Sequence, residues 1–137
     1  MRVTPENIMS LKNNEVFIFG ANLQGIHGRG AAKTALQWGA EIGVGEGLCG
    51  STYALPTIEK LRPYTPLSVA AIGQHVDTFI NVAKERRDLI FLVTEVGCGL
   101  CGYAPQDIAP LFKDAIDLEN VYLPERFWEA MNDIPGS

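Results

Sequence analysis

The sequence lacks the features that would place it in several specialised classes of protein. Its three cysteines, Cys49, Cys98 and Cys101, are an odd number without a spread-out framework, so we expect reduced thiols rather than a disulfide-stapled secreted fold. It has no run of about 18 apolar residues to cross a bilayer, and its N-terminus lacks the apolar core of a secretory signal. We therefore expect a cytoplasmic protein without membrane contact.

Basic residues are also scarce. The chain has 11 Lys and Arg against 16 Asp and Glu, a formal net charge of −5. Proteins that bind the nucleic-acid backbone gather Lys and Arg on one face, so general backbone binding is not expected here. Backbone amides can still bind a small anion, because they attract it without any formal charge.

Apolar residues, by contrast, are plentiful enough for one domain. The 137 residues are 47% hydrophobic, which at this length supports a core without a disulfide, a metal or a cofactor, and none of these is predicted. No repeat, low-complexity tract or linker divides the chain. We predict a single domain over residues 1–137.

Segments typical of strands and helices alternate along this domain. Strands are predicted from β-branched and aromatic runs at residues 15–20, 51–55, 88–94 and 120–123. Helices are predicted at residues 31–38 and 68–87, from Pro105 onward, and as a turn or two within 125–131. Strands alternating with helices predict an α/β fold whose largely parallel sheet is covered on both faces.

Local signals refine these boundaries. Ser68 is expected to cap the N-terminus of the long helix, because its hydroxyl can accept from a free amide of the first turn. Pro56 is expected to end the strand before it, which makes residues 57–66 a polar connection. Residues 39–50 are expected to be irregular.

Two glycine-rich loops each follow a predicted strand, at residues 20–32 and 97–103. Glycine lets a ligand approach the backbone, and free amides at the start of a helix attract anions. If the two strands are neighbours, both loops lie at the edge of the sheet where ligands of α/β proteins bind. The candidate binding residues are Gly20, Ala21, Asn22, Gly25, His27, Gly28, Arg29, Gly30, Ala31, Ala32, Gly97, Cys98, Gly99, Leu100, Cys101, Gly102 and Tyr103.

Each of these features also has a simpler interpretation. The first loop is equally well a tight turn with two solvated cations, Arg29 and Lys33. His27 can act as an acid or a base near neutral pH, but a single histidine more often has a structural role. Tyr103 can stack on a base or a ribose, or it can be a half-buried ring whose hydroxyl bonds to a carbonyl.

The segments 16–22, 28–32 and 96–102 resemble the two ligand loops of macro domains, in particular those of compact phage- and bacteria-associated macro-domain-like proteins. The resemblance covers most of residues 16–112. It implies a three-layer α/β/α fold, with a mixed and mostly parallel sheet, that binds ADP-ribose alone or on an ADP-ribosylated macromolecule. It also implies that residues 28–32 hold the diphosphate and that Asn22 and Tyr103 lie at the distal ribose.

The same resemblance bears on catalysis. Some macro-domain-like hydrolases release ADP-ribose with a loop aspartate and a lysine. Here Cys101 occupies the place of the aspartate, and Lys60 lies near that of the lysine but is displaced by an insertion. His27 and Lys60 are therefore the candidate catalytic residues of an ADP-ribosyl hydrolase. The missing aspartate favours the alternative of a module that reads or sequesters a nucleotide signal, with Lys60 a solvated cation.

A thiol redox site at Cys98 and Cys101 is an alternative from another class of protein. A CxxC pair at the start of a helix lowers a thiol pKa and suits disulfide exchange. Gly102 and Pro105 instead predict that the helix begins after the second cysteine, which disfavours this interpretation. Zinc would need two more closely spaced ligands, so no metal site is predicted.

Gly30→Val is expected to abolish binding of ADP-ribose at a modest cost in stability, because this position is predicted to need close approach of a ligand rather than packing. Calorimetric titration with ADP-ribose compares the variant with the parent. Serine at Cys98 and Cys101 is the control and should leave binding largely intact. Equal affinity of Gly30→Val and the parent would refute the assignment of the first loop.

Overall fold

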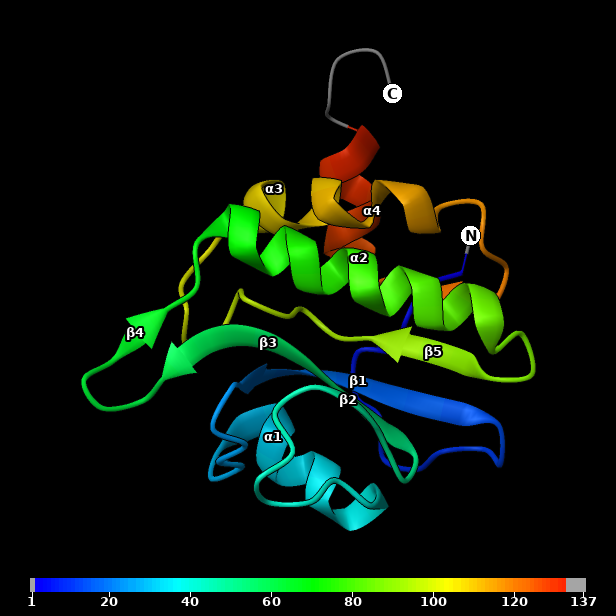
Figure 1. The fold of residues 1–137 in the computed structure, drawn as a ribbon. Helices are drawn as coiled ribbons and strands as arrows, with labels where there is room; N and C mark the ends of the chain where they lie inside the picture. The colour runs from blue at the N-terminus through cyan, green and yellow to red at the C-terminus, as the bar shows by residue number, and fades with distance from the viewer. Residues whose placement is uncertain (1, 133–137) are drawn as a thin grey trace.

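The chain folds as alternating strands and helices. A computed structural model describes residues 2–132, so residue 1 and residues 133–137 of the predicted domain lie outside the described part. Figure 1 shows the elements along the chain. In order they are β1 (Glu15–Asn22), α1 (Gly30–Ala35), η1 (Leu36–Trp38), β2 (Gly47–Cys49), β3 (Thr52–Lys60), β4 (Thr65–Pro66), α2 (Val69–Glu85), β5 (Ile90–Val93), α3 (Pro105–Ile108), η2 (Ala109–Ala115), β6 (Val121–Tyr122) and α4 (Glu125–Asn132).

Within residues 2–132, six strands form one mixed and mostly parallel sheet, which confirms the predicted α/β class. The strand order is β2-β3-β1-β5-β6, with β4 paired to β3 off this path. β3, β1, β5 and β6 run parallel to one another, whereas β2 and β4 are antiparallel to β3. A parallel bridge between Val3 and Leu123 extends the pairing beyond β6.

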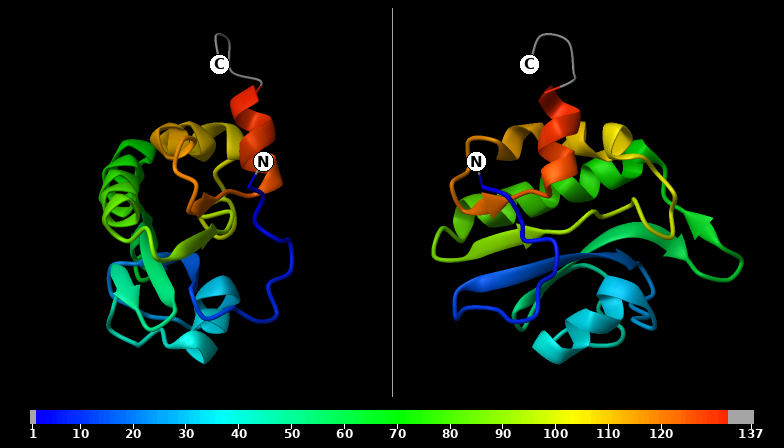
Figure 2. Two further views of the ribbon diagram at one scale, coloured as in Figure 1. Left: turned by 90° about the vertical axis from the view of Figure 1, so that its right-hand side faces the viewer. Right: turned by 180° about the vertical axis from the view of Figure 1, so that it is seen from behind.

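Helices cover both faces of this sheet, as the three-layer prediction requires. Figures 1 and 2 show α2, α3, η2 and α4 on one face and α1 with η1 on the other. Side chains alternate across β1 accordingly. Val16 and Ile18 join the larger core with α2, while Phe17 and Phe19 join the smaller core with α1.

The long amphipathic helix is the element that the sequence predicts best. α2 buries Ile72, Val76, Phe79, Ile80 and Ala83, the face expected from their spacing. Ser68 is confirmed as its N-cap, since its Oγ accepts a hydrogen bond from the amide of Ala71 at 3.1 Å. No helix in residues 2–132 is both long and apolar enough to cross a membrane.

The prediction that Pro56 ends its strand is wrong. β3 continues through Pro56 to Lys60, and the chain returns as β4, so residues 57–66 form a hairpin rather than a polar connection. Proline lacks an amide and is normally excluded from a central strand. Here the register with β1 shifts at this point, from Ala21 opposite Pro56 to Asn22 opposite Ile58, and the irregularity accommodates the proline. Residues 39–50, expected to be irregular, contribute β2.

The topology opens a crevice between β1 and β5. From β1 the chain crosses by α1 to β3, and from β5 it crosses by α3 and η2, on the opposite face, to β6 on the other side. The loops at the carboxyl ends of two neighbouring strands then diverge, and ligands of open α/β sheets bind at such a point. β1 and β5 pair directly, which confirms that the strands before the two glycine loops are neighbours.

Ser68→Ala is expected to lower the free energy of unfolding by about 1 kcal/mol, because the amide that Ser68 caps loses its acceptor. Urea denaturation measures the change. Ser68→Asp is the matched control, since aspartate keeps an acceptor at the N-cap and should retain most of the stability. A Ser68→Ala variant as stable as the parent would refute the capping role.

Candidate functional site

The two glycine loops, loop one (residues 20–32) and loop two (residues 97–103), begin side by side at the ends of β1 and β5. A Cβ added to Gly20 would lie 3.7 Å from the amide nitrogen of Gly97 and 3.4 Å from Oγ1 of Thr57 in β3. Thr94 ties the end of β5 to β1, because its amide and its hydroxyl both donate to the carbonyl of Ile18, at 3.2 and 2.8 Å. The neighbouring strands therefore bring the first residues of the two loops together.

Loop one presents a row of free amides. The amides of Leu23, Gly25 and Ile26 have acceptors within the protein. The next amide along the chain that has an acceptor is that of Lys33, which donates to the carbonyl of Arg29 at 3.2 Å. In the described part of the chain, no protein atom accepts from the amides of residues 28–32. Residues 28–31 are also exposed. These amides are available to an anion.

Loop two has fewer free amides, because some of its amides form hydrogen bonds within the turn. The amides of Cys98, Gly102 and Tyr103 each donate to a nearby carbonyl. Within residues 2–132, four others have no protein acceptor, those of Gly97, Gly99, Leu100 and Cys101. Only this second set can serve a ligand.

Gly28 and Gly99, one in each loop, are glycines that the fold does not require. Neither has a φ in the left-handed region, and no atom lies within 4 Å of a Cβ added to either. A larger residue would fit at both positions without strain. By contrast, a Cβ on Gly25 would collide with the backbone of Gly43. Gly30 has a φ of +56°, which strains any valine there, so the modest cost in stability predicted for Gly30→Val is wrong.

Asn22 holds loop one together from within. Its Nδ2 donates to the carbonyl of Ile26 at 2.8 Å, and its Oδ1 accepts from the amide of Ile26 at 3.0 Å. The side chain is only 5% exposed. Asn22 lies in the loop for which the resemblance predicts contact with a ribose, but its side-chain hydrogen bonds are to the backbone of the same loop.

His27 is buried beneath loop one, with 4% of its surface exposed. Its Nε2 lies 2.9 Å from the carbonyl oxygen of Glu41, and its ring packs edge-on against Phe19. Since a carbonyl only accepts, Nε2 donates, and Nδ1 is left without a partner among the described residues. The ring joins loop one to the segment around Glu41, so the geometry supports the structural interpretation rather than acid or base catalysis.

Tyr103 also turns toward the protein. Its ring packs against the larger core, and its hydroxyl donates to the carbonyl of Leu67 at 2.7 Å. This is the second of the two interpretations that the sequence allowed.

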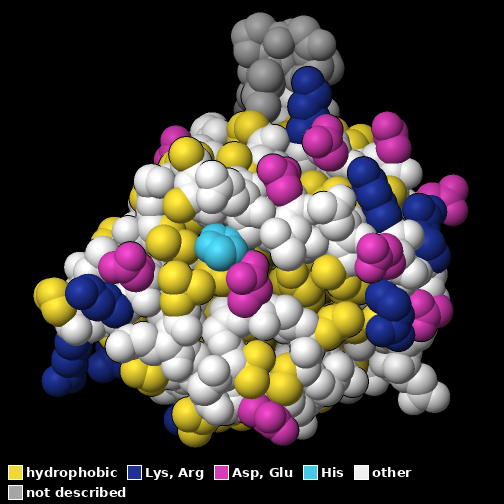
Figure 3. Space-filling view, in the orientation of Figure 1, with side chains coloured by type: hydrophobic (Ala, Val, Ile, Leu, Met, Phe, Trp, Pro, Cys, Tyr) yellow, Lys and Arg dark blue, Asp and Glu magenta, His cyan; other side chains and the backbone are white. Residues whose placement is uncertain are grey.

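The candidate lysine lies at the edge of the site. Lys60 ends β3 and is half-buried, and Arg62 follows it at the turn of the hairpin. Figure 3 shows Lys and Arg side chains gathering at the left edge of the molecule, where Figure 1 places this hairpin. Within residues 2–132, neither cation forms an ion pair, and neither do Arg29 and Lys33 of loop one and α1.

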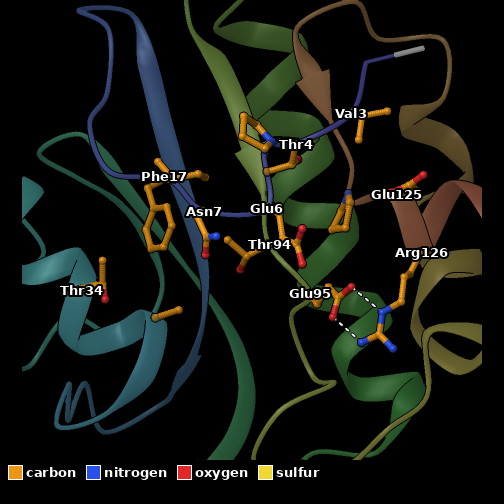
Figure 4. Close-up of a pocket in the computed structure, with 14 residues that line it drawn as sticks. Val3, Thr4, Glu6, Asn7, Phe17, Thr34, Thr94, Glu95, Glu125 and Arg126 are labelled. Carbon is orange, nitrogen blue, oxygen red and sulfur yellow. Dashed lines mark hydrogen bonds and ion pairs between the residues drawn. The ribbon is translucent and has the colours of Figure 1, made fainter.

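A cleft of about 900 Å³ opens beside loop one, and no sequence pattern marks it. The N-terminal segment passes between α1 and α4 (Figure 2), and its residues 3–8 line the cleft. Figure 4 shows Phe17, Thr34 and Thr94 around the opening. The residue shared with loop one is Ala31. The volume suits a small-molecule site, which typically has about 300–1,000 Å³.

The lining of this cleft is acidic. It includes three carboxylates, those of Glu6, Glu95 and Glu125, and one cation, Arg126. The guanidinium of Arg126 donates to Glu95 at 2.7 Å and lowers the pKa of that carboxyl, which outweighs the opposite effect of its partial burial. Glu95 is therefore ionised at neutral pH, and the cleft favours hydroxyl or amino groups over phosphate.

The cysteine pair does not have the electrostatics of a redox site. Burial, and then the nearby carboxylate of Glu95, raises the pKa of the Cys98 thiol to about 11, whereas disulfide exchange needs a lowered thiol pKa. The thiol of Cys101 donates to the carbonyl of Thr57 at 3.3 Å. In the described part of the chain, no three His, Cys, Asp or Glu side chains are grouped to hold a metal.

The fold and this crevice define the chain as an α/β domain with two amide-lined loops beside an acidic cleft. No protein-family model, curated protein or solved structure matches it. Its function must therefore be argued from the geometry of the site.

Cys98 is expected to react slowly with iodoacetamide at neutral pH, because its raised pKa leaves almost no thiolate. The measurement uses a variant with Cys49→Ser and Cys101→Ser, in which Cys98 is the one remaining thiol, and follows the rate against pH. The same variant in urea is the control and should react faster. A rate that already reaches its plateau near neutral pH would support the redox alternative instead.

Proposed function

We propose that this protein binds ADP-ribose, or a related nucleotide diphosphate, with the diphosphate on the two loops and the nucleoside in the adjacent cleft. The observation that carries the proposal is the pair Gly28 and Gly99. Each stands in a loop of free amides, and each leaves open space that the fold does not need. Glycine at such positions is explained by a ligand that approaches the backbone.

The charges around the loops support a diphosphate. Arg29 and Lys33 flank the free amides of loop one without an acidic partner among the described residues. An anion held by amides and by two nearby cations is compatible with a chain of net charge −5, because its attraction is local. Two sets of free amides, one in each loop, match the two phosphates of a diphosphate better than a single phosphate.

The cleft supports a nucleoside next to those phosphates. Its carboxylates suit the hydroxyls of a ribose or the amino group of a base, and they repel a further phosphate. Phe17, which is buried in the smaller core, lies at the base of this cleft. Ala31 belongs to loop one and also lines the cleft, so one ligand can reach from the loop into the cleft.

Binding without turnover is the activity that the geometry supports best. His27 is buried and hydrogen-bonded to a backbone carbonyl, which separates it from solvent and from a proton-transfer role. Cys101 stands where the resemblance places a catalytic aspartate, and its thiol bonds to Thr57. We therefore favour a module that reads or sequesters ADP-ribose, alone or on a macromolecule, over a hydrolase.

Gly28→Val and Gly99→Val are each expected to weaken binding of ADP-ribose by about tenfold or more, because the added side chain occupies the space of the diphosphate. Calorimetric titration measures the affinity. Stability should change by less than about 1 kcal/mol, since no atom meets a Cβ at either site. Ala70→Val, at an exposed position of α2, is the control for added bulk.

The parent protein should bind ADP-ribose more tightly than AMP, with NAD and a cyclic ADP-ribose isomer completing the series. Incubation with ADP-ribosylated protein or nucleic acid should leave the linkage intact, whereas release of ADP-ribose would identify a hydrolase. Equal affinity for AMP and ADP-ribose, or unchanged binding by both glycine variants, would refute the proposal.

A further inference from the structure

Loop two is held by the β3–β4 hairpin through three side chains. We call residues 57–67 the strap. The thiol of Cys101 donates to the carbonyl of Thr57 at 3.3 Å, and the hydroxyl of Tyr103 donates to the carbonyl of Leu67 at 2.7 Å. In the opposite direction, the hydroxyl of Tyr64 donates to the carbonyl of Leu100 at 3.1 Å. The strap thus holds the loop at both its middle and its end.

Loop one is bonded to the same strap. The amide of Leu61 donates to Oε1 of Gln24 at 3.2 Å, and the amide of Leu23 donates to the carbonyl of Ile58 at 2.9 Å. One short hairpin therefore contacts both loops. Loops one and two follow different strands, and the strap connects them through β3 and β4, separately from the pairing of β1 with β5.

Tyr64 is placed in an unusual way for an aromatic residue. It is 45% exposed, and no other aromatic residue in the described part is among the exposed large hydrophobic side chains. Its pKa is raised above the ordinary value, first by partial desolvation and then by hydrogen bonding with Cys101. Burial of the exposed ring contributes little to stability, so the main structural role of Tyr64 is the hydrogen bond that its hydroxyl donates to loop two.

The free amides of loop two lie where the strap holds it. Gly99, Leu100 and Cys101 have amides without a protein acceptor, and Tyr64 bonds to the carbonyl of Leu100 between them. A loop that is ordered before the ligand arrives binds more tightly, because less conformational entropy is lost on binding. Fixing Leu100 therefore orders the donors that the diphosphate would use.

We propose that the strap sets the separation of the two loops, and that Tyr64 and Gln24 are positioning residues for the ligand. Neither side chain has to touch the ligand. Tyr64 fixes loop two, Gln24 fixes the strap to loop one, and the ligand meets both sets of amides at the spacing that results. This inference rests on the proposed function, since it concerns how the same site is held ready.

The test is a double-mutant cycle of Tyr64→Phe and Gln24→Ala, with ADP-ribose as the ligand. Each substitution removes one exposed hydrogen bond and is expected to weaken binding about three- to tenfold. The double variant should lose less than the product of the two single effects, because both bonds act through one strap. Thr78→Val, at an exposed position of α2, removes the hydrogen bond from the Thr78 hydroxyl to the carbonyl of Gln74, away from both loops and the cleft, and should bind like the parent.

Amide hydrogen exchange of the ligand-free protein supplies the readout that a merely structural role would not move. Tyr64→Phe should speed exchange at Cys98, Gly102 and Tyr103, whose amides are hydrogen-bonded within the turn, and leave the amides of β1 and β5 unchanged. Unchanged affinity of Tyr64→Phe and Gln24→Ala, while Gly28→Val loses binding, would overturn the strap and keep the proposed function. Exchange that speeds equally in the loops and the strands would also overturn it. A parent that does not bind ADP-ribose would overturn the proposed function itself.

Discussion

The parallel pairing of β1 with β5 is the constraint on which the rest of the site depends. It runs from Glu15 opposite Ile90 to Ile18 opposite Val93, after which β5 gives way to loop two while β1 continues to Asn22. The crossovers from these strands leave in opposite directions and on opposite faces, so the two loops diverge at the edge of the sheet where ligands of open α/β proteins bind. Residues more than 60 positions apart in the chain thereby share one edge of the sheet.

At this edge of the sheet, the groups that attract anions belong to the backbone, whereas the negative charges belong to side chains. Loops one and two carry amides without a protein acceptor in the described part of the chain, while carboxylates such as Glu6 and Glu95 line the neighbouring cleft. The ion pair with Arg126 keeps Glu95 charged, so the cleft remains acidic at neutral pH. An acidic protein can present an anion site in this way, because amides attract an anion over a short range without changing the net charge.

Several side chains that the sequence singles out serve to build the loops. Asn22 bonds to the backbone of Ile26, His27 bonds to Glu41, and Tyr103 bonds to Leu67. A polar side chain that satisfies a nearby backbone group fixes a loop that has no ladder of its own. The resemblance to macro domains singles out Asn22 and Tyr103, and in the structure their side chains bond to the protein backbone, whereas the space over Gly28 and Gly99 is open.

The sequence by itself determined the α/β alternation, the buried face of α2, the cap at Ser68 and the position of the glycine loops, because each of these is encoded by neighbours within a few residues. Only the tertiary structure decided that β3 runs through Pro56. It also decided that the N-terminal segment closes a cleft and that one hairpin holds both loops. Those features depend on partners far apart in the chain, and no local pattern specifies which distant carbonyl a side chain will meet.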